Sequence, residues 1–162
     1  MVYYFAYGSN IDLKRVEGMD LHFSSIRAAT LHDWKLVFNV IDNKYEGTGY
    51  ANIVPSKHRS VEGLIYEIDR SSIKKLDFLE GYPHYYLKKK ITVVNNDDGA
   101  KINCLTYVGN QEMIEKGLKP LRIYMKHLLS GKIFMSNEYF RNLNHIKTIE
   151  GDRHHKLSTE KR

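Results

Sequence analysis

The sequence is poor in cysteine and has no long hydrophobic run. Cys104 is its one cysteine in 162 residues, which excludes an internal disulfide framework and a CxxC pair that could bind zinc. No apolar stretch reaches the roughly 20 residues that a membrane-spanning helix needs, and residues 1–10 lack the basic segment of a secretory signal. We therefore expect a soluble protein of the cytoplasm without a membrane partner.

Acidic residues are fewer than basic ones. The chain has 19 Asp and Glu against 25 Lys and Arg, a formal net charge of +6. A basic chain can bind nucleic acid. Here, however, the basic residues are spread along the sequence apart from residues 87–91 and the tail, and no RNA-binding motif stands out. Spread charges are typical of a solvated surface, so a nucleic-acid partner is not expected.

The spacing of apolar residues indicates many short strands and few helices. Residues 2–8 are β-branched and aromatic, which predicts a buried strand. Asn95–Gly99 is a turn signal between two strands and predicts a hairpin. Further strands are expected within 26–42 and at 47–56 and 60–69, and helical segments at 9–18, 71–80, 119–131 and 136–146.

Strands and helices do not alternate along this chain, which argues against a doubly wound α/β fold. We predict an α+β fold with a small, mixed or antiparallel, barrel-like sheet and a few short helices. At this length one domain is the natural expectation. We place it at residues 1–150, followed by a polar and flexible tail at 151–162. His154 and His155 in that tail have no neighbouring ligand that would complete a metal site.

Glu80 is a carboxylate in an unusual position. Residues 71–80 predict a short helix that stops at Gly81, with Ile73, Leu76 and Leu79 marking its buried stripe. At about 100° per residue, Glu80 falls within about 20° of Ile73. It also sits at the negative end of the helix dipole, where an acid is disfavoured. Taken alone, the pattern also fits a helix-end glutamate that points into water.

Residues 5–12 form a second unusual stretch, in which a predicted strand runs through Gly8 into a helix start. Ser9 is a candidate N-cap with Asp12 three residues further on. Gly8 would let a ligand approach the backbone closely, and the amides that follow would suit a carboxylate or an oxyanion. An ordinary strand-to-helix turn has the same pattern, so the loop alone does not decide its role.

Taken together, these motifs make the sequence resemble the gamma-glutamylcyclotransferase family. Tyr-Gly-Ser-Asn at 7–10 is followed by Leu-Asp-x-x-Glu-Gly at 76–81, and the resemblance extends over roughly residues 2–130. It implies a small barrel-like α+β domain that cleaves gamma-glutamyl compounds. In this reaction the substrate's α-amine attacks its own γ-carbonyl, which releases 5-oxoproline and a free amine.

The resemblance also implies roles for particular residues. The glutamate of the Glu-Gly motif is the general base and acid, which here is Glu80. The loop Tyr7, Gly8, Ser9 and Asn10 would hold the glutamyl group. Tyr107, in a Cys-x-x-Tyr segment, resembles a substrate contact, whereas Tyr86 and Tyr124 are looser matches. The sequence does not distinguish Tyr85 from Tyr86.

The implied chemistry agrees with what the sequence contains. The substrate supplies the nucleophile, so neither a Ser or Cys triad nor a metal or cofactor is required. Cys104, on one strand face with Ile102 and Thr106, is predicted to be a small core residue. One carboxylate can take the ammonium proton and return it to the leaving amine, provided that its pKa is raised towards neutrality. Burial and the helix C-terminus both act in that direction.

Three questions stay open at this stage. The leaving amine could be an amino acid, an isopeptide lysine, glutathione or a secondary metabolite, and the oligomeric state has no sequence signal. A catalytically silent small-molecule binding module of the same fold would carry the same motifs. A basic nucleic-acid-binding domain is the more distant alternative, and it would show steeply salt-dependent binding.

Overall fold

A computed structural model describes residues 1–151, so the predicted tail, with His154 and His155, lies outside the described residues. The elements follow in the order β1 Val2–Ala6, η1 Ser9–Ile11, α1 Leu13–Gly18, β2 Phe23–Ile41, β3 Gly49–Ile68, α2 Ser72–Leu79, β4 Tyr86–Asn95, β5 Lys101–Gly109, η2 Gln111–Met113, α3 Arg122–Leu129, η3 Lys132–Phe134 and α4 Asn137–Asn144.

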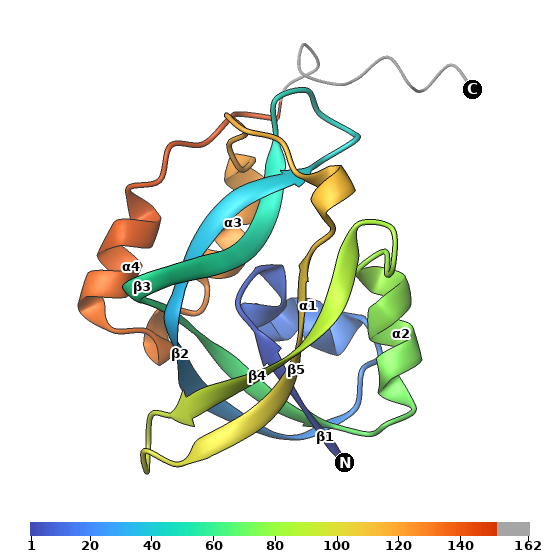
Figure 1. Ribbon diagram of the computed structural model, residues 1–162, viewed down its shortest axis with the longest axis vertical. Coiled ribbons are helices and arrows are strands. Elements are labelled where there is room, and N and C mark those ends of the chain that lie inside the picture. Colours follow the sequence, from blue (N-terminus) through green and yellow to red (C-terminus); the bar gives the residue numbers. More distant parts are fainter. Residues whose placement is uncertain (152–162) are drawn as a thin grey trace.

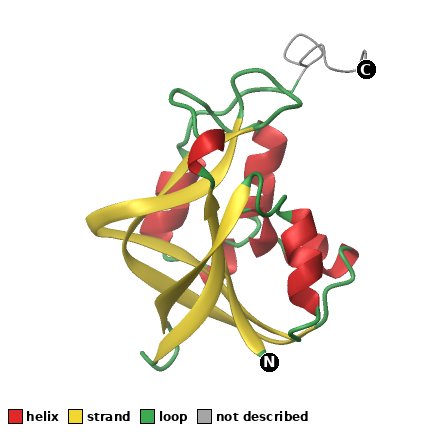
Figure 2. Cartoon of the chain, turned by 45° about the vertical axis from the view of Figure 1, so that its right-hand side comes forward, coloured by secondary structure: helices red, strands yellow, loops and turns green. Residues whose placement is uncertain are grey.

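The five strands form a closed barrel in the order β1-β3-β2-β4-β5. Neighbouring strands are antiparallel except β1 and β5, which are parallel and meet at Tyr4 and Leu105. In Figure 1, α3 and α4 lie to one side of the barrel and α2 to the other, and Figure 2 likewise shows helices on both sides of the strands. The prediction of a mixed, barrel-like α+β fold is confirmed.

β1 is buried on both faces because helices pack on either side of it. Phe5 and Tyr7 belong to a hydrophobic cluster that includes Met125 and Leu128 of α3. Tyr4 and Ala6 belong to a second cluster with residues of α1 and α2. The predicted buried strand is therefore confirmed, and its carboxyl end is held firmly between the two clusters.

β2 is a single strand where the sequence allowed one or two strands within 26–42, whereas β3 joins the separate strands predicted at 47–56 and 60–69. β2 and β3 are 19 and 20 residues long, and they pair with each other over nearly their whole length with three register irregularities. β3 runs through Pro55, which looked like a strand end. Pro55 pairs with Trp34 next to the irregularity between His32 and Trp34, and such a position tolerates a residue without an N–H.

The predicted hairpin and the later helices are confirmed. β4 and β5 pair from Tyr86 with Gly109 to Val94 with Lys101, so the chain turns at Asn95–Gly99. Ser136 caps α4 by accepting a hydrogen bond from the Tyr139 N–H. No helix of the described residues is long and apolar enough to cross a membrane.

Two local predictions were wrong. Ser9 does not act as the N-cap: Gly8 precedes η1, and Asp12 caps α1 by accepting from the Lys14 N–H. The predicted buried stripe of α2 also fails at Leu79, which is 41% exposed, although Leu76 is fully buried. The helix is only 8 residues long, and its last turn lines the open cleft instead of the core.

Candidate active site

The loop after β1 enters the site because β1 is clamped in the core. Tyr7 is buried, and its hydroxyl donates a hydrogen bond to the backbone carbonyl of Tyr107 on β5. Gly8 follows with φ −107°, and η1 begins directly after it. A short helix leaves its first N–H groups without partners inside the helix, so polar groups of the backbone gather at this turn.

Glu80 reaches the same place from the end of α2. It is the C-cap residue of that helix, and Gly81 follows in a left-handed conformation with φ 64°, so the predicted stop is confirmed. That conformation turns the chain away and leaves the Glu80 side chain directed inward, half-buried. Its Oε1 atom accepts a hydrogen bond of 3.1 Å from Nδ2 of Asn10.

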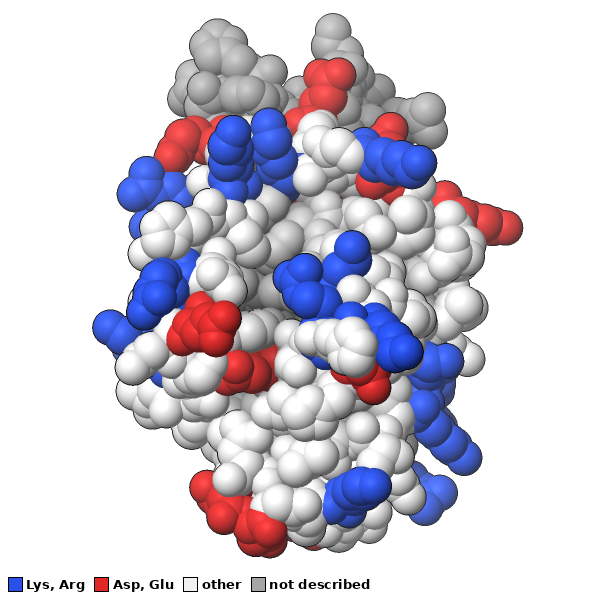
Figure 3. Space-filling view, turned by 60° about the vertical axis from the view of Figure 1, so that its left-hand side comes forward, with Lys and Arg blue, Asp and Glu red and all other residues white. Residues whose placement is uncertain are grey.

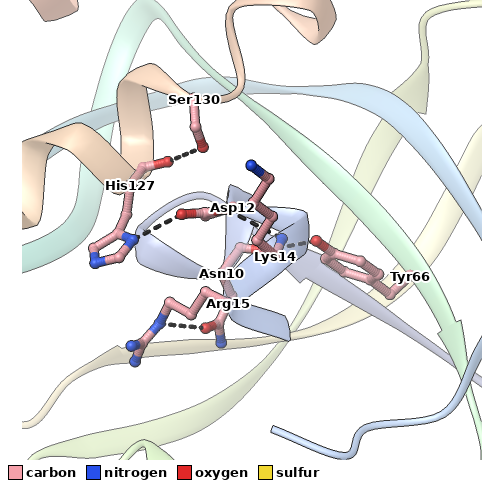
Figure 4. Close-up of polar contacts among 7 residues, drawn as sticks. All are labelled: Asn10, Asp12, Lys14, Arg15, Tyr66, His127 and Ser130. Carbon is pink, nitrogen blue, oxygen red and sulfur yellow. Dashed lines mark hydrogen bonds and ion pairs between the residues drawn. The ribbon is translucent and has the colours of Figure 1, made fainter. Parts of the chain in front are cut away.

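Asn10 is a buried residue with both polar atoms of its side chain engaged. Its Nδ2 also donates to the Tyr4 hydroxyl at 3.0 Å, and its Oδ1 accepts from Nε of Arg15 at 3.4 Å (Figure 4). Its backbone carbonyl accepts from the Tyr66 hydroxyl at 2.6 Å. A side chain held at this many points fixes the orientation of the Glu80 carboxylate.

The surroundings of Glu80 raise its pKa towards neutrality. Burial penalises the charged carboxylate and outweighs two opposing influences, the positive charge of Arg15 and the hydrogen bond from Asn10. The pKa is raised from the usual 4.5 to about 7. A carboxyl group with this pKa is half ionised near neutral pH, so it can both accept and return a proton there.

Tyrosine hydroxyls surround the carboxylate and stay protonated. Burial, together with the charge of Glu80, raises the pKa of Tyr4, Tyr7, Tyr86 and Tyr124. Two of them are tied to Ala51 on β3. The Tyr86 hydroxyl donates to the Ala51 carbonyl at 2.7 Å, and the Tyr124 hydroxyl accepts from the Ala51 N–H at 3.0 Å. These contacts make a rigid, hydrogen-bonding wall.

An inner pocket brings all the predicted site residues together. Tyr7, Gly8, Ser9, Asn10, Glu80, Tyr86 and Tyr107 all line it. Tyr86 faces this pocket, whereas Tyr85 lines only the cleft outside it, which settles the ambiguity between them. Tyr107 also donates a hydrogen bond of 2.6 Å to Oδ1 of Asp77.

Sequence reasoning missed four lining or supporting residues and treated Tyr124 only as a looser match. Tyr4, Ala51 and Thr106 line the inner pocket, and Arg15 supports Asn10. The sequence places Tyr4 in a predicted strand and Arg15 in a predicted helix, and neither pattern marks a contact with Asn10.

An outer cleft of about 630 Å³ opens from the inner pocket. The two share Ser9, Asn10, Glu80, Tyr86 and Tyr124, so Glu80 lies at their boundary. His127 in the cleft wall pairs with Asp12 at 2.8 Å (Figure 4). A ligand with one part in the inner pocket can therefore extend past Glu80 into a larger space.

Cys104 lies elsewhere, as predicted. It is 4% exposed and packs in a hydrophobic cluster. Burial raises the pKa of its thiol to about 12, and it lines neither the inner pocket nor the outer cleft. A protonated, buried thiol is a poor nucleophile.

Charged side chains are mixed on the face shown in Figure 3. Lys and Arg are interspersed there with Asp and Glu, and apolar or neutral surface separates them. This arrangement fits a solvated surface, which is how we interpret the net positive charge.

Comparisons with known proteins bear directly on this site. A family model described as gamma-glutamyl cyclotransferase, AIG2-like matches residues 4–127. The chain belongs to this family. The matched range contains the loop at 7–10, Glu80 and Tyr107, so the resemblance seen in the two motifs is confirmed.

Named relatives agree with this membership. A gamma-glutamylcyclotransferase of Bos taurus is 29% identical over 150 residues, which cover 89% of this chain and 78% of the relative. One of Homo sapiens is 30% identical over 109 residues, which cover 65% of this chain and 57% of the relative. The chain thus spans between about half and four fifths of the length of these two relatives.

Solved structures share the fold. One named gamma-glutamyl cyclotransferase superposes with a TM-score of 0.80 at 27% identity, covering 98% of this chain and 94% of that one. YkqA from Bacillus subtilis superposes with a TM-score of 0.77 at 25% identity, covering 91% of this chain and 56% of that one.

Proposed function

We propose that this chain is a gamma-glutamylcyclotransferase in which Glu80 acts as general base and then general acid. Glu80 takes a proton from the substrate's α-ammonium group. The freed amine forms a bond to the γ-carbonyl carbon, and the bond from that carbon to the leaving nitrogen breaks. Glu80 returns that proton to the leaving nitrogen as this bond breaks. The second proton, lost by the ring nitrogen as the lactam forms, then passes through Glu80 to the released amine, so that 5-oxoproline and an ammonium ion are the products.

The observation that carries this proposal is the position of Glu80. A carboxyl group with a pKa of about 7 lies at the mouth of a narrow pocket, and the pocket is walled by the loop of residues 7–10 and by protonated tyrosines. The N–H groups at the start of η1 are suited to the substrate's α-carboxylate or to the oxyanion. Ring closure is intramolecular, so orientation and proton transfer are what the protein must supply.

The test is a panel of gamma-glutamyl compounds with 5-oxoproline as the readout. We expect formation of 5-oxoproline in equal amount to the released amine. Binding of the same compounds without turnover would indicate a silent binding module instead. The free, buried thiol of Cys104 is compatible with the cytoplasm, which is the compartment that we propose for the reaction.

Cys104→Ser is expected to keep most of the activity, because the thiol lies outside the site. Placing a hydroxyl in an apolar environment should lower the free energy of unfolding by roughly 1–2 kcal/mol. Cys104→Ala is the matched variant without the polar atom. Turnover and thermal melting of both variants check this, and a folded Cys104→Ser protein without turnover would contradict the proposed use of the substrate's own nucleophile.

Arg15→Gln is expected to move the acidic limb of the pH profile to higher pH. Glu80 must be ionised to accept the ammonium proton, so kcat/KM should rise with pH through about 7 in the unchanged protein. The charge of Arg15 lowers the pKa of Glu80, and its removal raises that pKa further. The rate at pH 6 should then fall by roughly two- to fivefold, with little change on the plateau.

Lys14→Gln is the control for Arg15→Gln, because it removes a neighbouring positive charge that makes no contact with Asn10 (Figure 4). Its pH profile should match that of the unchanged protein. Equal shifts in both variants would show that overall charge acts on Glu80, and that the contact between Arg15 and Asn10 has no special role.

A further inference from the structure

The outer cleft is larger than the reaction itself requires. A volume of about 630 Å³ is in the range of sites that enclose a complete small-molecule ligand. The inner pocket of about 30 Å³ has room for little more than one water-sized group, so part of the glutamyl group also lies in the cleft beside Glu80. The part of the cleft beyond Glu80 must accommodate the substituent on the leaving nitrogen. The side chains that line this part therefore indicate the chemistry of that substituent.

Part of the rim of this cleft is apolar, although the exposed residues Arg15, Asn43 and Lys44 also line the cleft. Phe78 is 84% exposed and Ile123 is 66% exposed, and both line the cleft together with Leu79. Phe78 and Leu79 come from the end of α2 and Ile123 from α3, so the apolar side chains come from two separate elements. In the described part of the chain, the large exposed apolar residues are Met1, Phe78, Leu79, Tyr82, Leu87, Ile123 and Ile133.

Exposed apolar residues that are scattered singly need no explanation, whereas a group of them around a cleft marks a binding surface. Deeper in the cleft the wall is aromatic, with Tyr45, Tyr50 and Tyr85 each half-buried. Tyr50 packs edge-on against Tyr124 with ring centroids 5.4 Å apart. The aromatic wall is therefore continuous with the pocket that holds Glu80.

Three of the charged residues that line the cleft have partners within the protein. His127 pairs with Asp12, and Arg15 donates to Asn10. Asp42 accepts a hydrogen bond of 2.8 Å from the Lys44 N–H. The apolar rim therefore offers surface that a ligand could cover with the largest gain from burial.

We propose that the preferred substrate is a gamma-glutamyl conjugate whose leaving amine carries a large apolar or aromatic side chain. This inference rests on the proposed function. With the γ-carbonyl at Glu80, the leaving nitrogen lies at the boundary between pocket and cleft, and its side chain lies between the α2 and α3 sides of the rim. Covering Phe78 and Ile123 stabilises the bound state, and a small amine leaves both in water.

The first experiment compares γ-glutamyl-phenylalanine and γ-glutamyl-leucine with γ-glutamyl-glycine and the γ-glutamyl-ε-lysine isopeptide. We expect kcat/KM for the phenylalanine compound to exceed that for the glycine compound by about tenfold or more. Equal or better turnover of the glycine or lysine compound would overturn the inference while supporting the proposed function.

Variants of the exposed rim residues test whether the rim causes the substrate preference. Phe78→Ser and Ile123→Ser should each reduce the ratio of kcat/KM for the phenylalanine compound to that for the glycine compound by roughly threefold or more. Ile133→Ser is the matched control, because Ile133 is 84% exposed but lines a different cavity. Its ratio should not change. A ratio unaffected by the rim variants, or lowered equally by the control, counts against the proposed surface.

Two further measurements separate the remaining outcomes. If no compound yields 5-oxoproline, the proposed function fails, and calorimetric binding of the phenylalanine and glycine compounds still tests the preference by itself. If sedimentation shows a dimer that Phe78→Ser dissociates while the substrate ratio stays the same, then the rim is an interface between copies of the chain. That result would overturn the inference.

Discussion

Glu80→Gln is expected to lower 5-oxoproline formation by about 10²–10⁴, and by more if one carboxyl group serves both proton transfers. Glutamine keeps the size of the side chain, and its carbonyl oxygen can still accept the hydrogen bond from Asn10. It cannot take the ammonium proton. Steady-state turnover with a gamma-glutamyl substrate measures the effect, and the affinity for substrate should change much less than the rate.

Glu115→Gln is the control, because Glu115 is exposed and lines neither the inner pocket nor the outer cleft. It should retain full turnover. A folded Glu80→Gln protein with unchanged turnover would remove Glu80 from the mechanism. A variant that does not fold would instead assign it a structural role.

The stability of Glu80→Gln should change in the opposite direction from its activity. The pKa of Glu80 is raised on folding, so ionised Glu80 destabilises the native state. This penalty is absent below the unfolded pKa of 4.5, grows as pH rises, and is complete above about 7, where it amounts to roughly 3 kcal/mol. Thermal melts of both proteins should coincide at pH 4, and the variant should be the more stable at pH 8.

The sequence predicts the order of elements well where local signals are strong. Gly81 stops α2, Ser136 starts α4, and Asn95–Gly99 turns the hairpin. These features depend on a few neighbouring residues, whose conformational preferences are the same in any fold. The gathering of residues 7–10 with Glu80 was accessible only through the family resemblance, because 70 positions separate Asn10 from Glu80.

Other features depend on the whole barrel and have no local signal. β3 continues through Pro55 because its pairing partner β2 extends past the position opposite it, and a partner strand cannot be read from the chain itself. Leu79 fits the apolar stripe of α2 but lines the open cleft, so it remains exposed. Asp12 acts as the helix cap in place of Ser9, because Asp12 lies at the start of the longer helix α1.

The contacts that support Asn10 also have no local signal in the sequence. Tyr4 and Arg15 are ordinary strand and helix residues in the sequence, and only the turn of η1 brings both to Asn10. Their importance comes from what Asn10 does for Glu80. The role of such a positioning residue can be recognised only after the group that it positions has been identified.

Gly8→Val is expected to reduce activity by about 10² or more while the protein remains folded. The φ angle of Gly8 is −107°, which lies outside the left-handed region that favours glycine. A Cβ atom at this position would lie 3.3 Å from Cβ of Ala51 and 3.4 Å from the Tyr124 hydroxyl. Both are tight contacts in the wall of the inner pocket, and the two methyl groups of valine would occupy space needed by the glutamyl group.

Gly18→Val is the matched control for this prediction. Gly18 ends α1, and a Cβ atom there would meet nothing within 4 Å, so turnover should be unchanged. Gly8→Ala should give an intermediate loss, because its single methyl group must displace Ala51 or Tyr124 only slightly. Gly8→Val should cost roughly 1–3 kcal/mol of stability from crowding. Turnover and melting measured on all three proteins separate crowding in the pocket from loss of the fold, and normal turnover in Gly8→Val would show that this loop does not hold the glutamyl group.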